Sequence, residues 1–320
     1  MVQKTRRRVL VAGALAAAGL TVAKIAEAIP TGKLTIALVL KSLADPFTVA
    51  MASAAQNYQK HFASQFDLNV LGTSTELDTA TQIRMVDDLI GAHTSAIVLA
   101  PTDSKALVPA VARAINAGVI VIAIDNPLDE AALDALHLSV PFVGPDNRKG
   151  AETIGDYVAT KLARGDEVGI IEGVTTDRNA QQRTEGFKAA MDAAGMKVVA
   201  VAPGDYTYAK GKAAAATMLA QHPRLRALLC ANDNMATGAV DAVRLAHRTG
   251  SVYITGYNNN PDIRPLLNSG KILATVDQFA ARQAVFGIDV ALKALTEMTR
   301  QEDLTPLVET PLQLVKSGDR

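Results

Sequence analysis

The stretch Leu34–Phe47 reads LTIALVLKSLADPF and decides how the rest of the chain is interpreted. Its first seven residues are apolar or β-branched, and they end at Lys41 and Ser42, as in a buried strand followed by a polar loop. Asp45 then precedes Pro46, a pair typical of a turn that caps the following helix. The stretch therefore predicts a strand with polar groups at its carboxyl end, followed by a helix.

This unit recurs along the chain in two sets of five. The apolar runs of the first set are Leu34–Leu40, Leu68–Leu71, Ala96–Ala100, Val119–Ile124 and Leu138–Val143. Those of the second set are Val168–Ile171, Val198–Val201, Leu225–Cys230, Val252–Ile254 and Ile272–Val276. Helix-patterned stretches separate the runs, and such alternation builds an open parallel sheet with helices on both faces. We therefore expect an α/β fold with two similar doubly wound lobes, which hold a small polar ligand in a cleft at the carboxyl ends of their strands.

No long linker separates the two sets, so the chain must cross between the lobes through short connections. We expect the first crossing near Gly144–Asn147 and the second after Gln278, where the helix pattern Phe279–Thr299 begins. The tail Leu304–Leu314 is expected to cross again. The predicted lobes are residues 33–144 with 279–304, and residues 145–278 with 305–320. Several short crossings form a hinge that bends.

Composition limits the classes of partner. Lysine and arginine total 32, as do aspartate and glutamate, so the net charge is zero and nucleic acid is not an expected partner. Cys230 is the only cysteine, which excludes an intramolecular disulfide and favours a buried core residue. Beyond the N-terminal segment, no run of about 20 apolar residues occurs, so the mature chain is not expected to be embedded in a membrane.

Residues 1–28 read as an export signal. Arginines at positions 6–8 precede the apolar run Val9–Val22, and Ala26-Glu27-Ala28 fits a small-residue cleavage site. The arginines resemble a twin-arginine signal, but a general secretory signal remains the alternative. Because the cleavage region contains no cysteine, we expect no lipid anchor. An unanchored exported protein needs an enclosed outer compartment, and we therefore expect the periplasm.

Motifs for catalysis and metal binding are missing. The sequence contains no G-x-S-x-G, no H-E-x-x-H and no G-x-x-x-x-G-K-[ST]. Its five histidines are scattered without metal-ligand spacing, and nothing places one beside Cys230 as a catalytic partner. We therefore expect a binding protein with no cofactor and no metal, rather than an enzyme.

Several short motifs, in this order and spacing, resemble the periplasmic ribose-binding protein group, the sugar receptors of ABC importers. They are DPF at 45–47, APTDS at 100–104, VIAID at 121–125, GPDNRKG at 144–150, RTEGF at 183–187, ANDNMATGA at 231–239 and TGYN at 255–258. The resemblance covers the whole mature chain. It implies a type I periplasmic binding protein, a monomer that closes about its hinge on one ligand and delivers it to a membrane permease.

The resemblance also implies a set of ligand contacts. On the first lobe these are Lys41, Asp45, Phe47, Asp125 and Asn126; on the second they are Asn179 or Gln181, Tyr206, Asn232 and Asn258, with Gln278 at the hinge. These residue types suit a sugar because carboxylates accept from hydroxyls and amides both donate and accept. Aromatic rings stack on the C–H faces of the sugar.

Structural roles compete with ligand contact at several of these positions. Asp45 could cap the following helix, Phe47 could belong to the core, and Tyr208 rivals Tyr206. Three further residues are expected to be structural: Asp146 and Arg183 are expected to support the hinge or a loop, and Asp233 to cap a helix.

The identity of the ligand is open. The ribose receptor pattern has arginines where this chain has Asn126 and Gln181, and an aspartate where it has Asn258, while Lys41 supplies a cation on the opposite wall. These departures favour another pentose, a hexose or a sugar alcohol over ribose itself. A non-sugar ligand, such as a furanosyl signal or a nucleoside, is the alternative on the same fold. An effector domain of a transcription regulator is disfavoured because an export signal stands where a DNA-binding segment would be.

Overall fold

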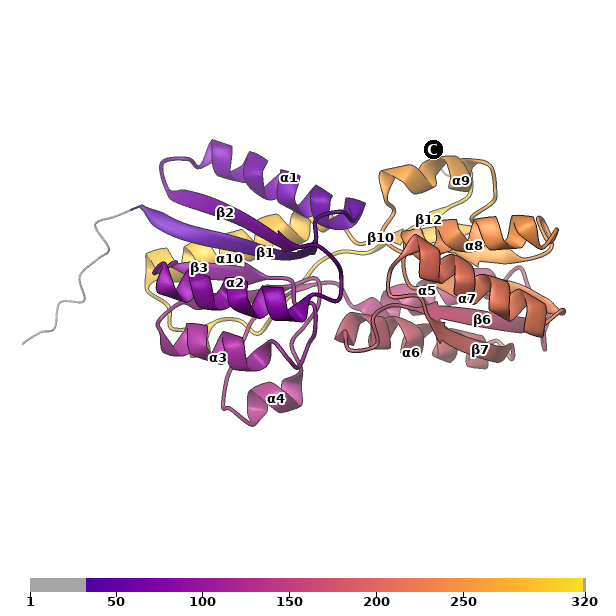
Figure 1. Ribbon diagram of the computed structural model, residues 1–320, viewed down its shortest axis with the longest axis horizontal. Helices are drawn as coiled ribbons and strands as arrows, with labels where there is room; N and C mark the ends of the chain where they lie inside the picture. The colour runs from indigo at the N-terminus through magenta and orange to yellow at the C-terminus, as the bar shows by residue number, and fades with distance from the viewer. Residues whose placement is uncertain (1–32, 319–320) are drawn as a thin grey trace, which may run out of the picture. The chain divides into compact units, whose positions relative to one another are not determined.

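The structure is a computed structural model that describes residues 33–318, and the predicted export signal lies outside them. Two six-stranded sheets organise these residues. The first sheet has the strand order β11-β5-β4-β3-β1-β2 and the second β12-β10-β9-β8-β6-β7. All ten predicted apolar runs contribute to the strands β1 to β10. The prediction of two doubly wound α/β lobes is confirmed (Figure 1).

The first lobe contains the first sheet and five α-helices. Its strands are β1 (Leu34–Ser42), β2 (Phe66–Thr73), β3 (Ala96–Leu99), β4 (Ile120–Ile124), β5 (Phe142–Gly144) and β11 (Leu307–Glu309). Its helices are α1 (Pro46–His61), α2 (Thr79–Gly91), α3 (Val108–Asn116), α4 (Glu130–Asp134) and α10 (Ala280–Glu297), with a 3-10 turn, η2, at Gln301–Asp303.

The second lobe repeats this plan. Its strands are β6 (Glu167–Glu172), β7 (Lys197–Pro203), β8 (Leu225–Cys230), β9 (Tyr253–Thr255), β10 (Ala274–Asp277) and β12 (Gln313–Lys316). Its helices are α5 (Asn147–Ala159), α6 (Arg178–Ala193), α7 (Tyr208–Gln221), α8 (Asp233–Leu245) and α9 (Arg264–Asn268), with a 3-10 turn, η1, at Pro261–Ile263. In the described part of this lobe the strand pairs are parallel except β10 with β12, which is antiparallel.

Strand β1 shows why apolar runs without polar alternation form these sheets. Ile36, Leu38 and Leu40 face a cluster that includes residues of α1 and α10, whereas Ala37 and Val39 face a second cluster with α2 and α3. Because helices cover both faces, both sets of side chains leave water, and the run is apolar throughout. In the second lobe, Cys230 at the end of β8 is buried in the core, as predicted.

The third crossing between the lobes lies within the predicted tail Leu304–Leu314, but the predicted lobe boundary differs from the structure. Residues 305–320 were assigned to the second lobe, but β11 pairs in parallel with β5 of the first sheet, with Leu307 opposite Phe142. The Thr310 amide also donates to the Gly144 carbonyl at 2.9 Å. The assignment of 305–309 to the second lobe is therefore wrong, and the chain crosses between Glu309 and Gln313. The short edge strand carried no pattern that distinguishes one sheet from the other.

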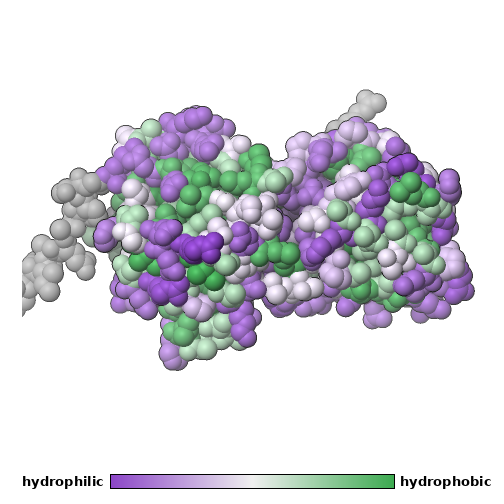
Figure 2. All heavy atoms as spheres, in the orientation of Figure 1, coloured by the Kyte–Doolittle hydropathy of each residue, from purple (hydrophilic) through white to green (hydrophobic). Residues whose placement is uncertain are grey.

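Within residues 33–318, no helix is long and apolar enough to cross a membrane. Figure 2 shows hydrophilic and hydrophobic residues mixed over the visible face of this part of the chain.

The close packing of α5 on α6 depends on Gly186. A Cβ atom there would lie 2.3 Å from the Arg148 carbonyl oxygen, which is backbone and cannot rotate away. We expect Gly186→Ala to lower the free energy of unfolding by about 2 kcal/mol, because the helices must separate. Chemical denaturation measures this. The control is Gly91→Ala, whose Cβ meets nothing within 4 Å; equal losses in both variants would contradict this account.

Candidate functional site

The polar side chains that follow the strands meet in one small cavity between the lobes. Its volume is about 30 Å³. Lys41 comes from the end of β1, Asp125 directly follows β4, and Asn232 follows β8. The complete lining is Lys41, Asp45, Phe47, Thr48, Glu76, Asp125, Asn179, Arg183, Tyr206, Asn232, Asn258 and Gln278. Both lobes contribute, as the positions of the strand ends predict.

Most of the predicted contact residues line this cavity, and two do not. The nine that do are Lys41, Asp45, Phe47, Asp125, Asn179, Tyr206, Asn232, Asn258 and Gln278. Asn126 is buried beside the cavity, where its Oδ1 accepts from the Asn179 amide at 3.1 Å. Gln181 is exposed, and its Nε2 donates to the Thr175 carbonyl. Of the two candidates on α6, therefore, the cavity contains Asn179 and not Gln181.

Sequence reasoning missed three lining residues, Thr48, Glu76 and Arg183. Asn179 and Arg183 are four residues apart and therefore lie on one face of α6, a signal that could have identified the arginine. The expectation that Arg183 is only structural is thus incomplete. Arg183 also supplies a guanidinium on this wall, two positions after Gln181 on the same helix. Nothing in the loop before α2 singled out Glu76.

Lys41 forms the electrostatic centre of the site. Its Nζ lies 2.8 Å from Asp177 Oδ2 and 3.3 Å from Asp125 Oδ2, and all three side chains are buried. Burial by itself would lower the pKa of Lys41, but the carboxylates of Asp177 and Asp125 outweigh it and raise that pKa well above its usual range. The ammonium is therefore charged, and it links the first lobe to Asp177 at the N-cap of α6 in the second.

Arg183 is a second buried cation of the site, and it donates hydrogen bonds to neutral groups. Nε donates to Asn147 Oδ1 at 2.8 Å, and Nη1 donates to the Ala231 carbonyl at 2.8 Å. Its guanidinium also stacks 3.8 Å from the centre of the Tyr257 ring. The amide oxygen, the carbonyl oxygen and the face of the tyrosine ring together stabilise the positive charge of the guanidinium and hold it at the cavity wall.

The two aromatic lining residues come from different lobes. Phe47 lies in the first turn of α1 and packs against the core of the first lobe, so it serves core and cavity together. Tyr206 is buried, and its hydroxyl donates to Asn179 Oδ1 at 3.0 Å. The rival Tyr208 is partly exposed and donates to Asp241 instead. The cavity therefore contains Tyr206 and not Tyr208.

Three lining residues have a left-handed backbone that L-amino acids seldom adopt. They are Asp125, Tyr206 and Asn258, with φ of 62°, 60° and 117°. Such conformations cost about 1 kcal/mol or more each, and they cluster at binding sites, where the surrounding structure holds them. This backbone geometry directs the strand-end side chains.

Some of the residues that line the cavity also cap the N-termini of helices. Asp45 Oδ1 accepts from the Phe47 amide, so the competing reading of Asp45 as a cap is correct, although the residue also lines the cavity. Asn232, not Asp233, caps α8 through the Met235 amide. The expectation for Asp233 is therefore wrong. Its carboxylate accepts instead from the Asn260 amide and the Thr275 hydroxyl, because it points back toward β10.

Direct contacts hold the two lobes together around the cavity. Asn234 Nδ2 of the second lobe donates to Asp45 Oδ2 at 2.8 Å. The Arg178 amide donates to Ser104 Oγ at 2.9 Å, beside the Asn126–Asn179 contact. With the Lys41–Asp177 ion pair, these bonds join loops of the first lobe to the N-termini of α6 and α8. The two walls of the site are therefore in direct contact.

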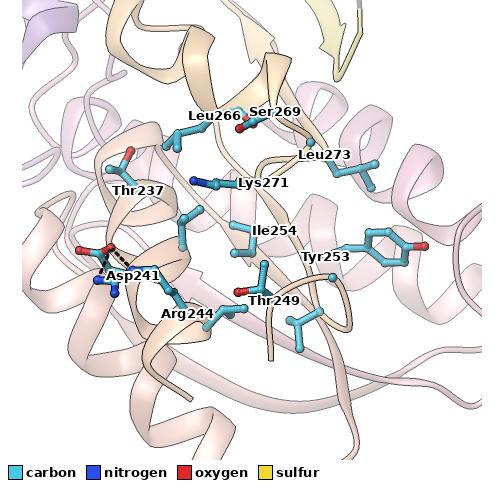
Figure 3. A pocket seen from close by; sticks show the side chains of 15 residues that line it. Thr237, Asp241, Arg244, Thr249, Tyr253, Ile254, Leu266, Ser269, Lys271 and Leu273 are labelled. Atoms are coloured by element: carbon cyan, nitrogen blue, oxygen red, sulfur yellow. Dashed lines mark hydrogen bonds and ion pairs between the residues drawn. The ribbon is translucent and has the colours of Figure 1, made fainter. Parts of the chain in front are cut away.

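A larger cavity of about 590 Å³ lies elsewhere, within the second lobe beside α8, β9 and α9. Figure 3 shows Ile254 and Leu266 on its walls, with Lys271 among them and Arg244 near Asp241. None of the predicted contact residues lines it. It also contains none of the buried side-chain atoms that lack a hydrogen-bond partner in residues 33–318. Despite its size, it is not the candidate site.

Comparison with known proteins places the chain in a family. The model of the periplasmic binding protein domain matches residues 36–298. The chain belongs to this family. The predicted resemblance is thereby confirmed, and the family consists of binding proteins. Within residues 33–318, no group of three histidine, cysteine or carboxylate side chains is arranged to hold a metal ion.

Three similar family members extend this result. The D-ribose/D-allose-binding protein of Pseudomonas aeruginosa is 54% identical over 280 residues, which are 88% of each chain. An ABC transporter solute-binding protein from Burkholderia multivorans, solved with an unknown ligand represented as alpha-D-erythrofuranose, has a TM-score of 0.87 and 57% identity over 89% of this chain and 100% of that one. Another, from Actinobacillus succinogenes with bound D-allose, has a TM-score of 0.83 and 29% identity over 89% and 98% of the two chains.

The ion pairs of Lys41 generate a prediction about stability. We expect Lys41→Ala to lower the free energy of unfolding by about 3 kcal/mol, because it leaves Asp125 and Asp177 buried without a cation. Adding Asp177→Asn removes one of those charges, so the double variant should recover about 1 kcal/mol or more. Chemical denaturation of the four forms measures the coupling. If the losses of unfolding free energy in the two single variants add up to the loss in the double variant, Lys41 and Asp177 are not energetically coupled, which would contradict this account.

Asn126 generates a separate prediction, because it joins the lobes without lining the cavity. We expect Asn126→Ala to weaken ligand affinity about fivefold by removing the acceptor of the Asn179 amide from the closed state. Calorimetric titration measures the affinity. The control is Asn57→Ala on the outer part of α1, for which no change is expected. Unchanged affinity in Asn126→Ala would mean that this contact does not contribute to closure.

Proposed function

We propose that the protein is a periplasmic receptor that captures a free aldose of the D-allose and D-ribose type and delivers it to an ABC importer. The observation that carries this proposal is the cavity itself, in which carboxylates of the first lobe, amides of the second and one cation from each lobe converge beside two aromatic rings. Carboxylates accept from sugar hydroxyls, lysine and arginine donate to them, and amides do both. The names of the similar proteins support the ligand class.

The choice between sugars follows from stereochemistry. D-Ribose and D-allose share the same configuration at carbons 2, 3 and 4, so one set of buried donors and acceptors can read both. A sugar epimeric at one of these carbons leaves a buried polar group unpaired, which costs about 1–3 kcal/mol, or roughly fivefold to 150-fold in affinity. The earlier preference against ribose loses one of its grounds, because Arg183 supplies a guanidinium on the second-lobe wall.

The mechanism is capture by hinge closure. The three crossings allow the lobes to separate, and a sugar bound to one wall completes the hydrogen bonds of the other. Lys41, Arg183 and the strand-end amides then contact the same ligand, which selectively stabilises the closed state. The permease recognises that closed form. The export signal expected at residues 1–28 and the family's location support the periplasm, by either the twin-arginine or the general secretory route.

A binding screen tests the proposal. We expect D-allose and D-ribose to bind the ligand-free mature protein with Kd values of about 1 µM or lower, measured by thermal shift and then by calorimetry. D-Glucose, the 3-epimer of D-allose, should bind at least about tenfold more weakly because one hydroxyl is misplaced. D-Arabinose serves as the matching control for ribose. Binding of a ribonucleoside but of no aldose would instead support the non-sugar alternative.

A further inference from the structure

Glu76 is the lining residue that neither the fold nor the interlobe contacts explain. It lies in the loop between β2 and α2 and borders the cavity. Its Oε1 is buried and has no hydrogen-bond partner among the described residues. A buried polar atom without a partner costs about 1–3 kcal/mol, so such an atom at a cavity wall points to a partner that the protein itself does not supply.

The loop keeps its conformation through other residues. Asp78 caps α2 by accepting from the Thr81 amide at 3.2 Å. The Thr73 hydroxyl donates to the Thr75 carbonyl at 2.8 Å, which fixes the chain on the other side of Glu76. The Glu76 side chain takes no part in either contact. A structural role in the loop therefore does not account for a glutamate at this position.

The charges around Glu76 decide the form of its carboxyl group. Burial raises its pKa to about 8, Lys41 opposes that rise, and Asp45, Asp177 and Asp125 add to it. Four carboxyl groups thus share the single nearby ammonium of Lys41, and the shift leaves Glu76 mostly protonated near neutral pH. A protonated carboxyl can donate one hydrogen bond and accept another, as a sugar hydroxyl can.

We propose that Glu76 is a further sugar-contacting residue, which hydrogen-bonds one ligand hydroxyl and so contributes to the selection among aldoses. This inference rests on the proposed function, because it assigns a role within the same cavity. It places a contact on the loop after β2, in addition to the contacts expected after β1, β4, β8, β9 and β10. The ligand would supply the missing partner of Oε1.

Two variants and a set of deoxy sugars test the assignment. We expect Glu76→Ala to weaken D-allose binding about tenfold, because a buried hydrogen bond is lost. Glu76→Gln should stay within about threefold of the wild type, since an amide also donates and accepts. Calorimetric titration measures each affinity. Glu297→Gln, an exposed glutamate at the end of α10, is the control and should not change it.

The deoxy sugars distinguish a direct hydrogen bond between Glu76 and the sugar from a general change in the shape of the cavity. Titration of wild type and Glu76→Ala with D-allose and with its 1-, 2-, 3-, 4- and 6-deoxy derivatives gives a thermodynamic cycle for each hydroxyl of the pyranose. We expect the penalty of Glu76→Ala to vanish for the sugar that lacks the contacted hydroxyl. An equal penalty for every sugar, or no penalty for D-allose, would overturn the assignment while leaving the proposed function intact. A wild-type protein that binds no aldose would overturn both.

Discussion

The ammonium of Lys41, buried between Asp125 and Asp177, is the interaction on which the rest of the site depends. A buried cation must be compensated, and here the compensating carboxylates belong to different lobes. One ion pair therefore joins the end of β1 to the N-cap of α6 and brings two sheet ends together. The surrounding amides, Asn126 with Asn179 and Asn232 with the backbone of Tyr206, complete a polar network in which most groups are satisfied.

This network explains how a receptor can be specific without being rigid. The interlobe contacts around the cavity, Lys41 with Asp177, Ser104 with Arg178, Asn126 with Asn179 and Asp45 with Asn234, are all polar. Each core is closed by its own helices, such as α1 with α10 in the first lobe and α7 with α8 in the second. A ligand that hydrogen-bonds to both walls shifts the population toward the closed form.

The sequence was sufficient to predict the fold because strands that helices cover on both faces appear as continuous apolar runs. The ends of these runs also predicted where the strands end. It also located most of the cavity, since residues directly after parallel strands must meet at one edge. The residues it missed lie within helices or loops. Arg183 lies inside α6, where the sequence does not distinguish a polar residue that faces the cavity from one that faces solvent. Glu76 follows β2 and belongs to no recognisable motif. The strand β11 was misassigned because pairing between distant segments leaves no local pattern.

The capping residues show a different limit. Asp45 caps α1 and also lines the cavity, so the structural and functional readings were never exclusive. Asn232 and Asp233 are adjacent, and only the backbone geometry determines which of them caps α8. Sequence spacing predicts the helix or strand on which a residue lies. The direction of a side chain at the start of a helix depends on the backbone dihedral angles there, and these are set by tertiary contacts.

The most direct test of this account is a crystal structure of the mature protein grown with D-allose. The account predicts one sugar in the cavity between the strand ends, with hydroxyls within hydrogen-bond distance of Lys41 or Asp125 on one wall and of Arg183 or Asn232 on the other. A sugar bound instead in the larger cavity beside α8 and α9, or a complex in which Lys41 and Arg183 contact no ligand atom, would contradict it.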